Sequence, residues 1–117
     1  MQSGAYRGQV RWLQRYRSVA IIPRDPYDIP AGMAKRLLRD RALSLTAEQQ
    51  ATYRRAIGLA REHGPCCRRC WRWEAFRGLS YDLIARHRWP APRLAMLVQA
   101  LDGCGGSWRG AQLDWPA

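Results

Sequence analysis

The chain has 117 residues, which suffices for one domain that buries a hydrophobic core without help from disulfides. Its formal net charge is +11, and its 20 basic residues, all arginine except Lys35, outnumber 9 acidic ones, so we expect nucleic acid or an acidic protein as a partner. No stretch approaches the roughly 18 apolar residues of a membrane-spanning helix, and the first residues lack an apolar signal segment, so we exclude a membrane protein and expect a cytoplasmic one.

Helical spacing runs through most of the chain, and it predicts an all-α fold: a compact bundle of about five or six short helices, forming a single domain over residues 1–117. Tyr6, Val10 and Leu13 form the apolar face of a first helix over about residues 5–18. The other face of this helix carries a basic patch: Arg7, Arg11, Arg15 and Arg17. This patch is the predicted contact for nucleic acid or an acidic partner, although most basic faces are simply solvated.

A proline-rich segment of about residues 20–30 interrupts the helical pattern. Its three prolines within eight residues, from Pro23 to Pro30, force extended or turning backbone. The apolar residues of the segment indicate that it packs along the domain, and a docking strap for a partner is the alternative.

Pro30 suits the first turn of a second helix that ends near Leu43. Thr46 and Gln49 form a capping box, which predicts the start of a third helix running to about Glu62. In these two helices the residues expected to be buried are Met33, Leu37, Leu38, Ala51, Tyr53, Ile57 and Ala60.

Three further helices are expected after the break at residues 63–65. The fourth runs from Pro65 to Gly78, the fifth from Ser80 to about Arg88, and the sixth over about residues 92–101. The sixth helix is expected to carry apolar side chains into the core: Leu94, Met96, Leu97, Val98 and Leu101.

Four cysteines distinguish this chain from an ordinary helical domain. Cys66, Cys67 and Cys70 lie within five residues at the start of the expected fourth helix, where the helix dipole and unpaired N–H groups stabilise thiolates. Cys104 lies among three glycines, which allow the backbone to approach a bulky group closely. In a reducing compartment clustered cysteines are more often ligands than disulfides. We therefore predict a metal or cluster site at these four residues.

A [4Fe–4S] cluster fits this grouping better than zinc does. Structural zinc sites usually take two separated cysteine pairs, whereas this chain has a triplet and a single cysteine. Adjacent cysteines can bind different irons of one cluster, because the cluster is several ångströms across. Zinc is the nearest alternative, with His63 as an additional candidate ligand. The residues expected to surround the site, offset its charge and shield it from water are Arg68, Arg69, Arg72 and Trp71.

Other interpretations of the thiols stay open. The cysteines could be buried as small apolar residues, Cys104 could form a disulfide with Cys67 or Cys70, or the triplet could hold a reactive thiol. No persuasive general base accompanies them, so we predict no catalytic residue and no turnover. A thiol protein that handles soft metals or organometals would use the same ligands with one exchangeable position.

A second function class is DNA binding. Residues 77–86, Arg-Gly-Leu-Ser-Tyr-Asp-Leu-Ile-Ala-Arg, resemble the opening of a helix-turn-helix of the kind found in region 4 of sigma factors, and the resemblance extends to Leu101. It implies a DNA-binding regulator in which residues 92–101 form the recognition helix. In this alternative the cysteines would form a structural zinc or redox thiol site. This segment offers chiefly Arg93 and Gln99 to base edges. The leading prediction is thus a small metal-binding protein for electron transfer, sensing or partner contact.

Overall fold

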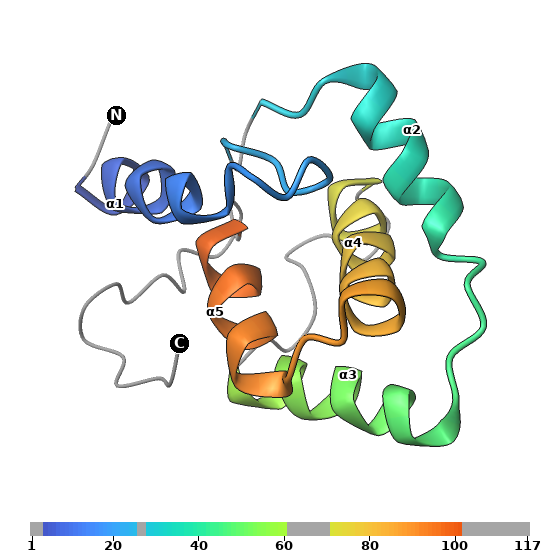
Figure 1. Ribbon diagram of the computed structural model, residues 1–117. Coiled ribbons are helices and arrows are strands. Elements are labelled where there is room, and N and C mark those ends of the chain that lie inside the picture. Colours follow the sequence, from blue (N-terminus) through green and yellow to red (C-terminus); the bar gives the residue numbers. More distant parts are fainter. Residues whose placement is uncertain (1–3, 26–27, 61–70, 102–117) are drawn as a thin grey trace.

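The computed structural model describes residues 4–25, 28–60 and 71–101, and within these ranges it contains five α-helices and no β-strand (Figure 1). The helices are α1 Gly4–Leu13, α2 Ala31–Asp40, α3 Ala47–Leu59, α4 Trp71–His87 and α5 Ala91–Leu101, with a 3₁₀ turn, η1, at Gln14–Tyr16. The predicted all-α fold is confirmed. No helix of these ranges combines the length and the apolar character that crossing a lipid bilayer requires.

The first helix is shorter than predicted, because the chain tightens into η1 after Leu13. Leu13 and Tyr16 are buried, as an inward apolar face requires. The proline-rich segment that follows is irregular in its described part, and Ile21, Ile22 and Pro23 are buried. This segment therefore packs along the domain, as predicted.

The capping box of α3 is formed as predicted. The Gln49 N–H donates to Thr46 Oγ1 at 3.1 Å, and the Thr46 N–H donates to Gln49 Oε1 at 3.0 Å. The predicted buried face of α3 is wrong at Ala51, which is exposed, whereas Ala56 is fully buried. At 3.6 residues per turn these two alanines lie about 140° apart around the helix. The buried face of α3 is thus centred on Ala56, and it continues to Ala60, the residue that follows the helix.

Residues 71–87 form one continuous helix of 17 residues, so the predicted break between a fourth and a fifth helix is wrong. Gly78 does not end a helix. It lies where α2 crosses α4 so closely that a Cβ at this position would overlap the backbone carbonyl of Leu37. Ser80 does not cap a new helix either, because its Oγ donates to the Phe76 carbonyl at 2.8 Å.

Helix α5 lies in the middle of the core. α3 and α1 pack against it, while α2 packs against α4 (Figure 1). The side chains that the sequence predicts to be buried in α5 are all at most 5% exposed: Leu94, Met96, Leu97, Val98 and Leu101. The chain enters α5 through a turn in which Arg88 takes a φ of 55° and the Trp89 N–H donates to the Leu83 carbonyl at 3.1 Å.

Candidate functional site

The predicted cysteine site falls on residues outside the described ranges. These residues are the four thiol ligands, the additional candidate ligand His63 and two of the surrounding arginines: Cys66, Cys67, Cys70, Cys104, His63, Arg68 and Arg69. The site therefore stays a prediction. In the part of the chain that the structure describes, no group of three or more His, Cys, Asp or Glu side chains is arranged to hold a metal ion.

Trp71 and Arg72, which directly follow the cysteine triplet, begin α4. The Trp71 side chain is 47% exposed, and the guanidinium carbon of Arg72 lies 5.9 Å from the centre of a Trp71 ring. Phe76, five residues later, is buried. Trp71 thus lies at the surface, directly after Cys70 in the sequence, and it is not part of the buried core.

The two segments that carry the cysteines leave the described fold close to each other. The Gln99 side chain, which is 1% exposed, donates from Nε2 to the Ala60 carbonyl at 2.9 Å. Ala60 is the last described residue before the triplet, and Gln99 lies two residues before Leu101, the last described residue before Cys104. A buried hydrogen bond therefore joins the end of α3 to the last turn of α5. The two cysteine-bearing segments of the chain begin just beyond these two helix ends.

The predicted basic patch is exposed. Each of its four members lies at the surface: Arg7, Arg11, Arg15 and Arg17. The guanidinium carbon of Arg15 lies 3.6 Å from the centre of the Trp12 ring, a cation–π contact that holds this cation in place. Arg24 extends the surface from the following segment, because it is also exposed and donates from Nη2 to the Arg17 carbonyl at 3.4 Å.

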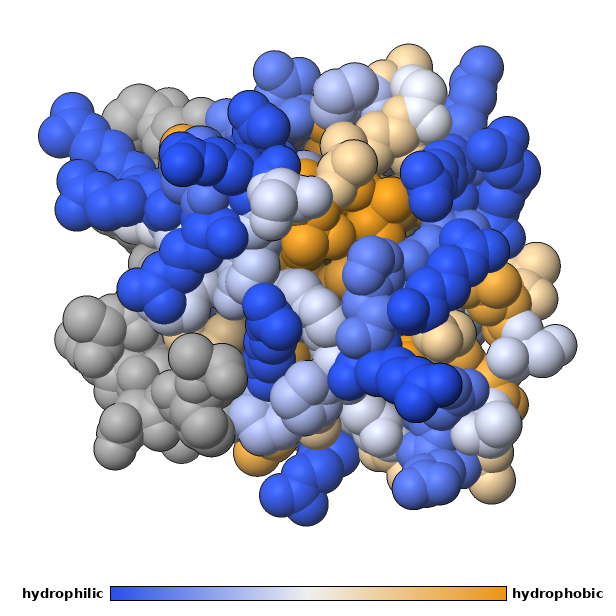
Figure 2. Space-filling model, viewed as in Figure 1, coloured by the Kyte–Doolittle hydropathy of each residue, from blue (hydrophilic) through white to orange (hydrophobic). Residues whose placement is uncertain are grey.

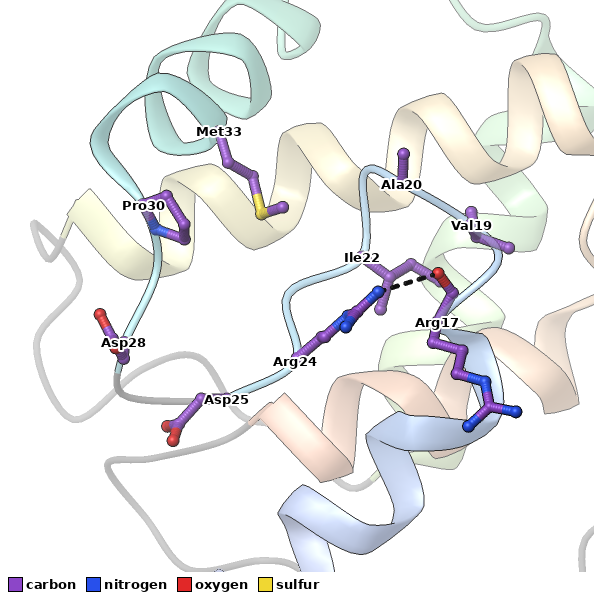
Figure 3. A pocket seen from close by; sticks show the side chains of 9 residues that line it. All are labelled: Arg17, Val19, Ala20, Ile22, Arg24, Asp25, Asp28, Pro30 and Met33. Atoms are coloured by element: carbon purple, nitrogen blue, oxygen red, sulfur yellow. Dashed lines mark hydrogen bonds between the residues drawn. The ribbon is translucent and has the colours of Figure 1, made fainter.

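A pocket of about 440 Å³ lies between the irregular segment after η1 and the start of α2 (Figure 3). Met33 comes from α2, and the Arg24 side chain crosses toward the Arg17 carbonyl. Asp25 and Asp28 also line the pocket, at the end away from Arg17. Two cations and two carboxylates thus line one pocket, so its charge favours neither an anion nor a cation. A docking role for this segment stays a prediction.

The segment that resembles a helix-turn-helix contains α5, whose position does not suit a recognition helix. Gln99 is bonded to the Ala60 carbonyl inside the fold. Arg93, at the start of α5, lies with its guanidinium carbon 4.3 Å from the centre of the Trp89 ring and 5.7 Å from that of Tyr16. A recognition helix has to present polar side chains to the major groove. The two side chains that the sequence offered for base contacts are instead engaged within the protein.

A buried carboxyl pair that the sequence analysis did not single out joins α2 to α4. Asp40 is 7% exposed and Asp82 is fully buried. Arg86 Nη1 lies 2.7 Å from Asp82 Oδ2 and 3.7 Å from Asp40 Oδ1, and His87 Nε2 lies 3.6 Å from Asp82 Oδ1. Burial, followed by the hydrogen bond and the repulsion from Asp82, raises the pKa of Asp40 above its usual 3.8. The i, i+4 spacing of Asp82 and Arg86 is visible in the sequence, whereas the approach of Asp40 from α2 is a tertiary contact that leaves no local signal.

Comparison of the chain with models of known protein families, with curated proteins and with solved structures finds no match.

Proposed function

We propose that this protein is a small metal-binding protein in which Cys66, Cys67, Cys70 and Cys104 ligate a [4Fe–4S] cluster. Its role would be electron transfer, sensing or contact with a partner, without catalytic turnover. Zinc bound by the same thiolates is the alternative centre.

The bond between Gln99 and Ala60 is the observation that carries this proposal. It joins the two chain positions from which the cysteine segments begin. Cys104 lies three residues beyond Leu101, and Cys66 lies six residues beyond Ala60. A fully extended chain spans at most about 3.3–3.6 Å per residue, which allows about 10 Å of reach for the first segment and about 20 Å for the second. These reaches, added to the contact between the two starting points, support the convergence of Cys104 with the triplet that we propose.

The charge around the predicted site also supports a thiolate centre. Four thiolates would leave the centre anionic, and Arg72 lies in the first turn of α4, two residues after Cys70 in the sequence. A cation beside an iron–sulfur cluster stabilises its reduced form and raises its potential. The exposed Trp71 next to Cys70 supplies an apolar surface at the same place.

Anaerobic reconstitution tests the proposal. The protein is purified without oxygen, its absorption spectrum is recorded, and iron, sulfide and zinc are quantified per chain. A cluster predicts about four irons and four sulfides per chain with a broad visible absorption band. One zinc without sulfide would support the alternative. A folded, metal-free protein with four titratable thiols would falsify both.

Single variants then assign the ligands. Cys104→Ser removes the ligand that comes from the other segment, so we expect loss of bound iron with the helical circular dichroism unchanged. His63→Ala is the matched control: it retains the cluster if four thiolates hold it, and it weakens zinc binding if His63 is a ligand. Rapid exchange of a bound soft metal in the wild type would instead indicate the metal-handling alternative.

A further inference from the structure

The surface around α1 holds a concentration of positive charge that the described part of the protein leaves uncompensated. Figure 2 shows strongly hydrophilic side chains over the α1 side of the molecule and over other parts of the same face. We define the arginine surface by five exposed residues: Arg7, Arg11, Arg15, Arg17 and Arg24. Within the ranges that the structure describes, no carboxylate forms an ion pair with any of them. Asp25 and Asp28 share the pocket with Arg17 and Arg24, whereas residues 4–24, which carry all five arginines, include no acidic residue.

Three arginines of α4 and of the turn after α2, by contrast, form ion pairs with acidic residues of α4. Glu74 accepts from Arg41 Nη1 at 3.0 Å and from Arg77 Nη2 at 2.6 Å. Arg86 is paired with Asp82 at 2.7 Å. Two acidic residues of α4, Glu74 and Asp82, are therefore paired with arginines, whereas the arginine surface has no such pair within the described ranges.

The arrangement on α1 is unfavourable for the helix by itself. Arg7 and Arg11 are four residues apart, so they lie on one face about 6 Å apart along the axis. Like charges at this spacing destabilise a helix, and an anionic partner removes that repulsion. The contact with Trp12 holds the Arg15 guanidinium at the surface before any partner arrives, which reduces the entropy lost on binding.

From these observations we propose that the arginine surface binds the phosphodiester backbone of nucleic acid without reading its sequence. Guanidinium groups match phosphate oxygens in a bidentate geometry, and backbone contacts dominate the affinity of nonspecific complexes. The apolar side of α1 and η1 faces the core, where Leu13 and Tyr16 are buried. The five side chains that define the arginine surface are all cationic, and the aromatic side chain in contact with them, Trp12, is half-buried under Arg15. The burial of α5 also favours binding without sequence recognition, because the helix that the sequence resemblance offers for base contacts lies inside the fold.

The test measures salt dependence with short labelled duplex DNA, single-stranded DNA and single-stranded RNA. If all five arginines contact phosphates, the slope of log K against log salt is about −4.5 for a duplex and about −3.5 for a single strand. Duplex affinity then falls roughly 500-fold between 50 and 200 mM salt. The tightest binding among the three probes at one salt concentration identifies the form of nucleic acid that the surface prefers.

A pair of double variants makes the test specific. Arg7→Gln with Arg11→Gln should make the duplex slope shallower by about 1.8. Arg54→Gln with Arg55→Gln is the control, because it removes the same charge from exposed positions on α3. Thermal unfolding and circular dichroism establish that both variants are folded. The proposal predicts a change of slope for the α1 pair and none for the α3 pair.

Three results would overturn the proposal: equal losses in both double variants, absence of binding at low salt, or equally tight binding of a polyglutamate peptide with the same slope. The last result would indicate an acidic protein as the partner. Because the variants leave every cysteine in place, metal content can be measured in the same samples. Failure of this proposal is thereby distinguished from failure of the proposed metal centre.

Discussion

Gly78→Ala tests how closely α2 and α4 pack. The added Cβ would overlap the Leu37 carbonyl, and it would lie 3.2 Å from the Arg41 backbone nitrogen. Both neighbours are backbone atoms, so no change of rotamer relieves the overlap and α2 has to move away from α4. Overpacking a core costs about 1–3 kcal/mol, and alanine regains about 1 kcal/mol of helix propensity over glycine. With the cost at its upper end, we expect a net loss of about 2 kcal/mol in the free energy of unfolding.

Gly58→Ala in α3 is the matched control, because nothing lies within 4 Å of its added Cβ. Here helix propensity acts alone, and the variant should gain about 0.5–1 kcal/mol. Urea unfolding followed by circular dichroism gives both values, with the m-value checked for constancy. The two substitutions should shift the transition midpoint in opposite directions. A Gly78→Ala protein as stable as the wild type would refute the close approach of α2 to α4.

The remaining predictions concern a turn, a cap and the buried carboxyl pair. Arg88→Gly relieves a left-handed backbone conformation and should raise the melting temperature, corresponding to a gain of about 1 kcal/mol; a lower melting temperature would contradict the strain. Thr46→Ala removes the acceptor for the Gln49 N–H and should cost about 1 kcal/mol in urea unfolding, and a neutral result would mean that the cap contributes nothing. The pKa of Asp40 is raised in the folded state by burial and by Asp82. The folded protein therefore binds this proton more tightly than the unfolded chain does, which stabilises the fold fully below pH 3.8. This stabilisation is lost as pH rises through the raised pKa. Asp40→Asn should therefore gain stability relative to the wild type as pH rises above about 4, and a pH-independent difference in unfolding midpoints would contradict this.

Local patterns in the sequence predicted what local interactions determine. The capping box was predicted correctly because it consists of hydrogen bonds between two residues that are three apart in the sequence, Thr46 and Gln49. Helix α5 was predicted correctly because its apolar side chains repeat at helical spacing. Gly78 misled the prediction, since a glycine that ends a helix and one that admits a neighbouring helix look alike in sequence. Asp40 and Asp82 meet across two helices, a contact that no spacing along the chain encodes.

The candidate site was predicted less completely than the fold. The exposure of Arg7 and Arg11 followed from the amphipathic pattern of α1. No local pattern indicates that Gln99 donates to the Ala60 carbonyl, because this contact depends on how α3 crosses α5. The ligand assignment for the cysteines still depends on spacing alone.

The bond between Gln9 and Ala100 has a consequence for the order of folding. Gln9 Nε2 donates to the Ala100 carbonyl at 3.0 Å, across 91 residues of sequence. During synthesis the N-terminal helix emerges first, but its buried partner is made only after α2, α3 and α4. Contacts of such long sequence separation close late, because the loop entropy must be overcome first. We therefore expect the docking of α1 to be among the last steps of folding, in which case a nascent or truncated chain would expose its arginines on an unanchored segment.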